Sequence, residues 1–144
     1  MNRLNVLVCV CACVCARVWA GTPVRVDDCF LNALRQVESG GKNVVGDNGK
    51  AIGVMQIHKS YWQDAIQFDP SIGGSYSDCL NSPTYSRKIV VAYLTRYASQ
   101  NATYEELARI HNGGCNIMHK KKTTAWNNTT NYWIKIKKEM NKTK

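Results

Sequence analysis

Apolar residues recur every three or four positions along most of this chain, which predicts five or six helices. The clearest starts at Ser82-Pro83, because serine caps a helix and proline fits its first turn. Thr103 and Glu106 form a capping-box pattern that opens the next helix. The predicted helices cover about residues 27–39, 56–65, 82–99, 103–111 and 129–140.

A glycine-rich stretch after the first predicted helix has the pattern of strands rather than of a helix. Val44-Val45 and Ala51-Ile52 flank the turn sequence Gly46-Asp47-Asn48-Gly49, which is typical of a β-hairpin. Asp47 would then lie at or near the tip of the hairpin. These patterns together predict an α+β domain that is mainly helical, with one small hairpin.

The N-terminus, residues 1–20, has the pattern of a secretory signal peptide. The basic start Asn2-Arg3 precedes an apolar run over residues 4–16, and Val18-Trp19-Ala20 places small residues before a cleavage site. A membrane anchor is the alternative, but the run is short for a bilayer span. We therefore expect a secreted protein in which residues 21–144 form a single domain.

Cysteines and glycosylation sequons agree with export. Four of the seven cysteines lie within residues 1–20, and Cys29, Cys79 and Cys115 remain. In an exported chain these three allow one disulfide and one leftover thiol, or no disulfide. Four N-glycosylation sequons also favour export: Asn101, Asn127, Asn128 and Asn141.

The chain is basic, with 19 Lys and Arg residues against 10 Asp and Glu residues. Removing residues 1–20 takes away Arg3 and Arg17, so the net charge falls by two, from +9 to +7. Such a charge favours an anionic partner, such as a bacterial envelope, a nucleic acid or an acidic glycan. The alternative is that the protein, like many secreted proteins, is simply basic.

Two carboxylates are predicted to lie in different environments. Glu38 falls in the last turn of the first helix, where the helix dipole and partial burial both disfavour a negative charge. This is the behaviour of a general acid. Asp47 would be solvated and ionised in the turn, although Asp is also common in turns for structural reasons. Cleavage of a glycosidic bond requires two carboxyl groups in environments of different polarity, so that one stays protonated and the other is ionised.

Several motifs follow one another along the chain: Glu38-Ser39-Gly40, Gly53-Val54-Met55-Gln56-Ile57, Tyr61-Trp62, Ala108-Arg109-Ile110-His111-Asn112-Gly113-Gly114 and Tyr132-Trp133. In this order they resemble the lysozyme superfamily. The closest likeness is to invertebrate-type (destabilase-like) lysozymes, and the hairpin around Asp47 also resembles goose-type lysozymes and soluble lytic transglycosylases. The resemblance implies a lysozyme-like fold and cleavage of the β-1,4 bond between N-acetylmuramic acid and N-acetylglucosamine in peptidoglycan. It implies that Glu38 is the general acid, with Asp47 the candidate second carboxylate.

Four further side chains are candidates for substrate contacts: Gln56, Tyr61, His111 and Asn112. Amides and aromatic rings suit the polar edges and apolar faces of sugars. Each also has a structural interpretation. Gln56 could bond only to the backbone, Tyr61 could belong to the core, His111 could be a structural histidine, and Asn112 could lie in a helix end. For Ser39 we expect a hydrogen bond near the helix end.

We therefore predict a secreted, bacteriolytic and antimicrobial muramidase that acts on peptidoglycan as a monomer. Two alternatives remain open. One is a lytic transglycosylase that uses Glu38 alone and leaves an anhydro sugar. The other is a basic protein that binds peptidoglycan or membranes without catalysis. The sequence has no P-loop, zinc-ligand spacing or nucleic-acid motif, so we expect no cofactor, metal, nucleic acid partner or stable membrane insertion.

Overall fold

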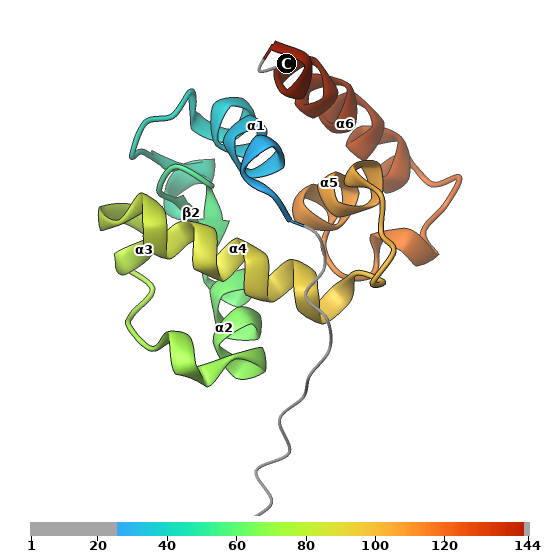
Figure 1. The fold of residues 1–144 in the computed structure, drawn as a ribbon. Coiled ribbons are helices and arrows are strands. Elements are labelled where there is room, and N and C mark those ends of the chain that lie inside the picture. Colours follow the sequence, from blue (N-terminus) through green and yellow to red (C-terminus); the bar gives the residue numbers. More distant parts are fainter. Residues whose placement is uncertain (1–25, 143–144) are drawn as a thin grey trace, which may run out of the picture.

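The computed structural model describes residues 26–142, which form six α-helices and a small antiparallel sheet (Figure 1). The predicted mainly helical α+β class is confirmed. The proposed signal peptide and the start of the domain at residue 21 lie outside the described residues. The helices are α1 (Asp28–Ser39), α2 (Lys59–Phe68), α3 (Asp78–Asn81), α4 (Pro83–Tyr97), α5 (Tyr104–Gly113) and α6 (Thr124–Lys142). The strands are β1 (Val45–Gly46), β2 (Ala51–Ile52) and β3 (Ile57–His58), and short 3₁₀ turns are η1 (Asp47–Gly49), η2 (Pro70–Ile72) and η3 (Ile117–His119).

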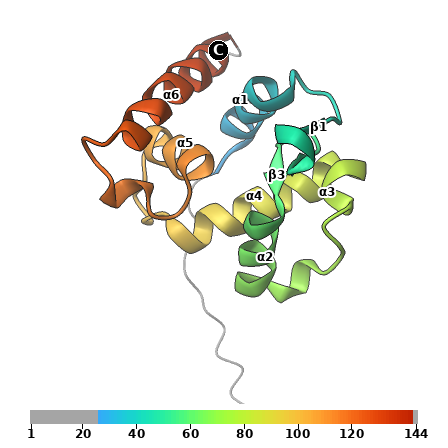
Figure 2. The ribbon, with the colours of Figure 1, turned by 180° about the vertical axis from the view of Figure 1, so that it is seen from behind.

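Helix α4 crosses the middle of the molecule, as Figures 1 and 2 show from opposite sides. On one side of it lie α1, α5 and α6, and on the other lies α2, while the sheet lies between α1 and α2 beside the first half of α4. The side chains of Ile89, Val90 and Leu94 on α4 are fully buried. This helix therefore forms the centre of the core, as its apolar stripe predicts.

Local sequence signals set the helix ends that the sequence predicted. The Asp27 side chain accepts a hydrogen bond from the Phe30 backbone N–H at the start of α1, and Gly40 ends that helix with φ of 60°. Ser82 accepts the Tyr85 N–H at the start of α4. The capping box between Thr103 and Glu106 is present at the start of α5.

Helix α6 begins at Thr124, five residues before the predicted start at 129. Its first turns contain Asn and Thr, which are poor helix formers, so sequence propensity alone does not predict this extension. The buried Arg109 side chain supplies the missing support. Its guanidinium donates to the Trp126 carbonyl and to the Thr129 hydroxyl, and it lies 4.0 Å from the Trp126 ring centroid.

The sheet has three strands in the order β1-β2-β3, one more than the predicted hairpin. The hairpin itself is confirmed, with Val45 opposite Ile52 and Gly46 opposite Ala51. Residues 56–58 were predicted to begin a helix, and this prediction was wrong, because α2 begins at Lys59. Gln56 has a φ of 47°, in the left-handed region that ends regular helix, and Ile57 then pairs with Ile52 as a third strand.

No disulfide joins any two of Cys29, Cys79 and Cys115 in the described part of the chain. The sequence allowed one disulfide or none, and the structure has none. Cys79 is completely buried, so it packs as a small apolar residue of the core.

Candidate active site

All six residues predicted for the site line one groove, which has a volume of about 230 Å³. The groove lies between the end of α1, the sheet, the start of α2 and the end of α5. Two further residues, Ala51 and His58, complete its lining. The predicted members are Glu38, Asp47, Gln56, Tyr61, His111 and Asn112.

Glu38 lies in the last turn of α1, and 18% of its side chain is exposed. Its Oε1 atom accepts a hydrogen bond of 2.5 Å from the Tyr132 hydroxyl of α6, and Nε2 of His111 lies 3.4 Å from the same oxygen. The carboxyl group is therefore held between two helices at the wall of the groove. This fixed, partly buried position suits a group that must transfer a proton to one bound atom.

His111 is almost completely buried, with 4% of its side chain exposed, and Tyr61 contacts its other ring nitrogen. The Tyr61 hydroxyl lies 3.0 Å from His111 Nδ1. The Tyr61 ring stacks on Tyr93, with centroids 3.5 Å apart and planes at 16°. Burial raises the pKa of Tyr61 well above its ordinary value, and the nearby Tyr93 and Glu38 raise it further, so its hydroxyl keeps its proton.

Asp47 begins the turn η1 with a φ of 46°, and 54% of its side chain is exposed. Its Oδ2 atom lies 3.3 Å from Nε2 of His58 on β3. The left-handed backbone at a residue other than glycine is a strained conformation of the kind that occurs at functional sites. The turn therefore presents a solvated carboxylate to the groove in which Glu38 is partly buried.

Gln56 lines the groove and also holds the sheet together. Its amide nitrogen donates to the carbonyl groups of Val44 and Gly53, at 3.1 and 2.9 Å. Its Oε1 lies so close to Gly46 that a Cβ there would be 2.0 Å away. Position 46 consequently has room only for glycine while the Gln56 amide stays in place.

Ser39 makes the hydrogen bond expected near the helix end, together with a longer-range one. Its hydroxyl contacts the Arg35 carbonyl at 3.3 Å and the Val54 carbonyl at 2.9 Å. The second contact ties the end of α1 to the segment after β2. Ser39 thus links the side of the groove that carries Glu38 to the side that the sheet forms.

Comparison with known proteins identifies the family of this fold and groove. The family model described as Destabilase matches residues 26–139. The chain belongs to the destabilase family.

The relatives of this destabilase-family chain are lysozymes. It is 31% identical to lysozyme 1 of Crassostrea virginica in an alignment 112 residues long that covers 74% of this chain and 55% of that protein, so it spans about half of that relative. It is 32% identical to the invertebrate-type lysozyme of Ruditapes philippinarum, over 81% of this chain and 83% of that protein. The crystal structure of Tapes japonica lysozyme is similar with a TM-score of 0.60 and 31% identity, over 79% of this chain and 90% of that one. The predicted resemblance to invertebrate-type lysozymes, which are glycoside hydrolases, is confirmed.

Two side chains around the groove of this destabilase-family member were not predicted from the sequence. Tyr132 was named only as part of the motif Tyr132-Trp133, and no pattern showed that its hydroxyl reaches Glu38. His58 was placed inside a predicted helix, which obscured its position on a strand opposite Asp47. A correct strand assignment would have placed position 58 next to the hairpin, because Ala51 pairs with it.

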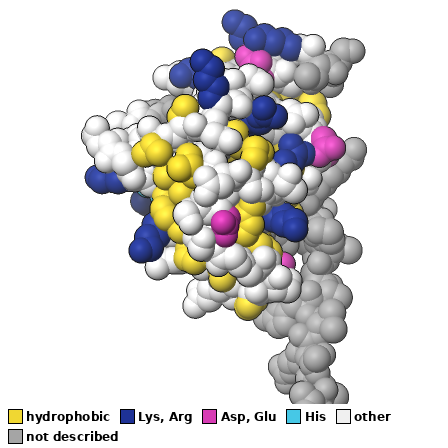
Figure 3. All heavy atoms as spheres, turned by 90° about the vertical axis from the view of Figure 1, so that its left-hand side faces the viewer, with side chains coloured by type: hydrophobic (Ala, Val, Ile, Leu, Met, Phe, Trp, Pro, Cys, Tyr) yellow, Lys and Arg dark blue, Asp and Glu magenta, His cyan; other side chains and the backbone are white. Residues whose placement is uncertain are grey.

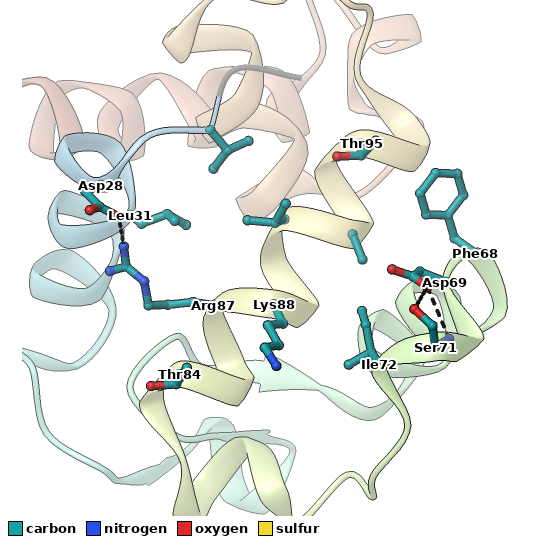
Figure 4. Close-up of a pocket in the computed structure, with 13 residues that line it drawn as sticks. Asp28, Leu31, Phe68, Asp69, Ser71, Ile72, Thr84, Arg87, Lys88 and Thr95 are labelled. Atoms are coloured by element: carbon teal, nitrogen blue, oxygen red, sulfur yellow. Dashed lines mark hydrogen bonds and ion pairs between the residues drawn. The ribbon is translucent and has the colours of Figure 1, made fainter. Parts of the chain in front are cut away.

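A larger cavity of about 730 Å³ lies elsewhere, between the start of α1, α4 and η2 (Figure 4). Its carboxylates already have partners: Asp28 pairs with Arg87, and Asp69 accepts hydrogen bonds from Ser71. The smaller groove is the better candidate for chemistry, because it brings a partly buried acid, Glu38, together with an exposed one, Asp47. Among residues 26–142, no group of three or more His, Cys, Asp or Glu side chains is arranged to hold a metal ion.

Proposed function

We propose that this protein is a secreted bacteriolytic muramidase that hydrolyses the β-1,4 bond between N-acetylmuramic acid and N-acetylglucosamine in peptidoglycan. The observation that carries the proposal is the position of Glu38. Its partly buried carboxyl group lines a groove that also contains the exposed carboxylate of Asp47. Membership of the destabilase family supports the same activity.

In the proposed reaction, Glu38 donates its proton to the glycosidic oxygen as the bond to that oxygen breaks. Positive charge then develops on the sugar ring, and Asp47 faces that charge from the turn. Asp47 either attacks or stabilises the ring carbon, which gives retention, or positions a water molecule, which gives inversion. Retaining enzymes hold their two carboxyl groups about 5–5.5 Å apart, and inverting enzymes about 6.5–9.5 Å.

The other groove residues are proposed to contact the sugar chain. Asn112 is exposed at the end of α5 and can offer both a donor and an acceptor to an acetamido group. Tyr61 and His111 provide ring surface at the base of the groove while they bond to each other. Gln56 contributes chiefly by holding the hairpin, because its amide nitrogen already bonds to two carbonyl groups.

The basic surface supports an anionic cell wall as the partner. Lys and Arg side chains are spread over the face shown in Figure 3 and do not gather in one patch. A distributed positive charge attracts anionic polymers over distances of about 10 Å at moderate salt.

Within residues 26–142, no helix is both long and apolar enough to cross a membrane. We propose that the chain is exported by residues 1–20 and acts as a monomer.

The proposal is tested by mass analysis of the fragments released from purified peptidoglycan by the wild type and by Glu38→Gln. We expect muropeptides with reducing ends from the wild type. The Glu38→Gln variant should release them about a hundred- to ten-thousand-fold more slowly, which is the usual contribution of a general acid. Glu139→Gln is the matched control, because Glu139 pairs with Lys142 on α6 and does not line the groove.

Each alternative gives a different result in the same experiment. Anhydro ends would mean that the protein is a lytic transglycosylase. Bacterial killing that persists in Glu38→Gln, without released muropeptides from either protein, would mean a protein that acts without catalysis. Either result would contradict the proposed hydrolysis.

A further inference from the structure

We infer that Tyr132 is a positioning residue for Glu38: its hydroxyl group holds Oε1, so that Oε2 carries the proton that goes to the substrate. This inference deepens the proposed function and rests on it. Tyr132 does not line the groove, so it acts through Glu38 and not on the sugar.

The hydrogen bond from Tyr132 and the closest approach of His111 involve the same oxygen of the Glu38 carboxyl group. The Tyr132 hydroxyl donates to Oε1 at 2.5 Å, and His111 Nε2 lies 3.4 Å from the same atom. Among residues 26–142, no group is bonded to Oε2. In a protonated carboxyl group, the carbonyl oxygen is the better hydrogen-bond acceptor, so the proton belongs on the oxygen that Tyr132 does not bind. Oε2 is therefore the oxygen left to face the groove.

The contact with Tyr61 determines which ring nitrogen of His111 carries the hydrogen. The Tyr61 hydroxyl, which keeps its proton because it is buried, can donate to His111 Nδ1 at 3.0 Å. A neutral imidazole that accepts at Nδ1 carries its hydrogen on Nε2. His111 Nε2 lies 3.4 Å from Glu38 Oε1. The contacts Tyr61–His111–Glu38 thus place a polar N–H group near the oxygen that accepts the Tyr132 hydrogen bond.

The Tyr132 hydroxyl remains a donor throughout the reaction. Burial raises the pKa of Tyr132 well above its ordinary value, and the charge of Glu38 and the hydrogen bond to it raise the pKa further. When the Oε2 proton moves to the glycosidic oxygen, the C–O bond breaks and its electron pair stays on that oxygen. The negative charge left on Glu38 then meets the Tyr132 hydroxyl already in place, with His111 Nε2 3.4 Å away, which is electrostatic preorganisation.

Other titratable groups face Glu38 from each neighbouring element in the described chain. Tyr132 comes from α6, His111 from α5 and Tyr61 from α2, while Asp47 and His58 lie across the groove. Among residues 26–142, Tyr132 forms the one side-chain hydrogen bond to the Glu38 carboxyl group, and it lies outside the groove lining. Its removal therefore changes the environment of the acid without removing a contact to the substrate.

The test compares Tyr132→Phe with the wild type in full pH–rate profiles of muropeptide release. A hydrogen bond to a carboxylate favours its charged form, so without the hydroxyl the acid should lose its proton at higher pH. We expect the alkaline limb of the profile to move up by about one pH unit. At the optimum, kcat should fall about ten-fold because the acid is held less firmly, and KM should change little.

Two further variants make the result decisive. Tyr85→Phe is the matched control, because its hydroxyl donates to the Gly73 carbonyl and accepts from Trp62 away from the groove. It should keep the wild-type profile. Replacing Tyr132 by 3-fluorotyrosine keeps the ring and makes the hydroxyl a stronger donor, so the limb should move to lower pH. If Tyr132→Phe keeps the alkaline limb of Tyr85→Phe, this inference is overturned while the proposed function stands. If the wild type releases no muropeptides, the proposed function fails and the inference fails with it.

Discussion

Nε2 of His58 lies 3.3 Å from Oδ2 of Asp47, and both residues line the groove. The two side chains are 48% and 54% exposed, so water screens the interaction between them. A pair this exposed contributes at most about 1 kcal/mol, whether to folding or to orienting the carboxylate.

We therefore predict that His58→Gln has small effects on stability and on activity. The midpoint of thermal unfolding, followed by circular dichroism, should change by less than about 5 °C. The rate of muropeptide release should fall by no more than about five-fold, which corresponds to 1 kcal/mol. A loss as large as that of Glu38→Gln would contradict this prediction and make His58 part of the catalytic chemistry.

Asp47→Asn should have a much larger effect on activity than on stability. Asn tolerates the left-handed backbone at this position, where φ is 46°, so the turn should keep its shape. Loss of the negative charge that faces the developing positive charge should lower kcat about a hundred-fold, with little change in KM. Asp28→Asn is the control, because Asp28 is an exposed acid outside the groove lining. An unchanged rate with anhydro products would show that Glu38 acts without Asp47.

The parts of this fold that sequence predicts are those set by neighbouring residues. Asp27, Ser82 and Thr103 cap their helices by hydrogen bonds to groups three residues away. The turn at Asp47 follows from the glycine and asparagine around it. The position of Glu38 at the end of α1 follows from the helix stop at Gly40 in the same way.

The parts that sequence does not predict depend on residues far apart in the chain. Tyr132 reaches Glu38 across 94 positions, and Arg109 supports the first turns of α6 across 17 to 21 positions. Strand β3 was missed because Gln56 adopts a left-handed conformation that its own amide stabilises through bonds to Val44 and Gly53. Tertiary contacts override local propensity in each case.

Gly53 should be among the positions least tolerant of substitution. Its φ is 78°, and a Cβ there would lie 1.9 Å from the backbone oxygen of Cys79, which cannot move independently of α3. We predict that Gly53→Ala lowers the free energy of unfolding by at least about 3 kcal/mol, from backbone strain and steric overlap together. Urea unfolding measures the change.

Gly114→Ala separates the two causes of the Gly53 effect. Gly114 has a similar φ of 83°, but a Cβ there would meet no atom within 4 Å. Its ψ of 171° puts it in a backbone region almost confined to glycine, so its substitution should cost only that backbone strain, about 1–3 kcal/mol. Equal losses for the two variants would show that overlap with Cys79 contributes nothing.

The Cys79 thiol makes the free energy of unfolding depend on pH in the alkaline range. Burial raises the pKa of its thiol from 9.0 to about 12, and the nearby Asp78 adds to the rise. In the unfolded chain the thiol loses its proton near its ordinary pKa, whereas in the folded protein it remains protonated until about pH 12. Its contribution to stability is therefore fully present below pH 9 and is lost as the pH rises from 9 toward 12.

Urea unfolding at pH 8 and pH 10 tests this linkage when the wild type is compared with Cys79→Ala. The wild type should lose about 1 kcal/mol more than the variant between the two pH values, because only its unfolded state can ionise at position 79. The tyrosines, Cys29 and Cys115 are present in both proteins, so their own titration cancels in the comparison. Equal losses would mean that the Cys79 thiolate forms as readily in the folded protein as in the unfolded chain, which its complete burial beside Asp78 opposes.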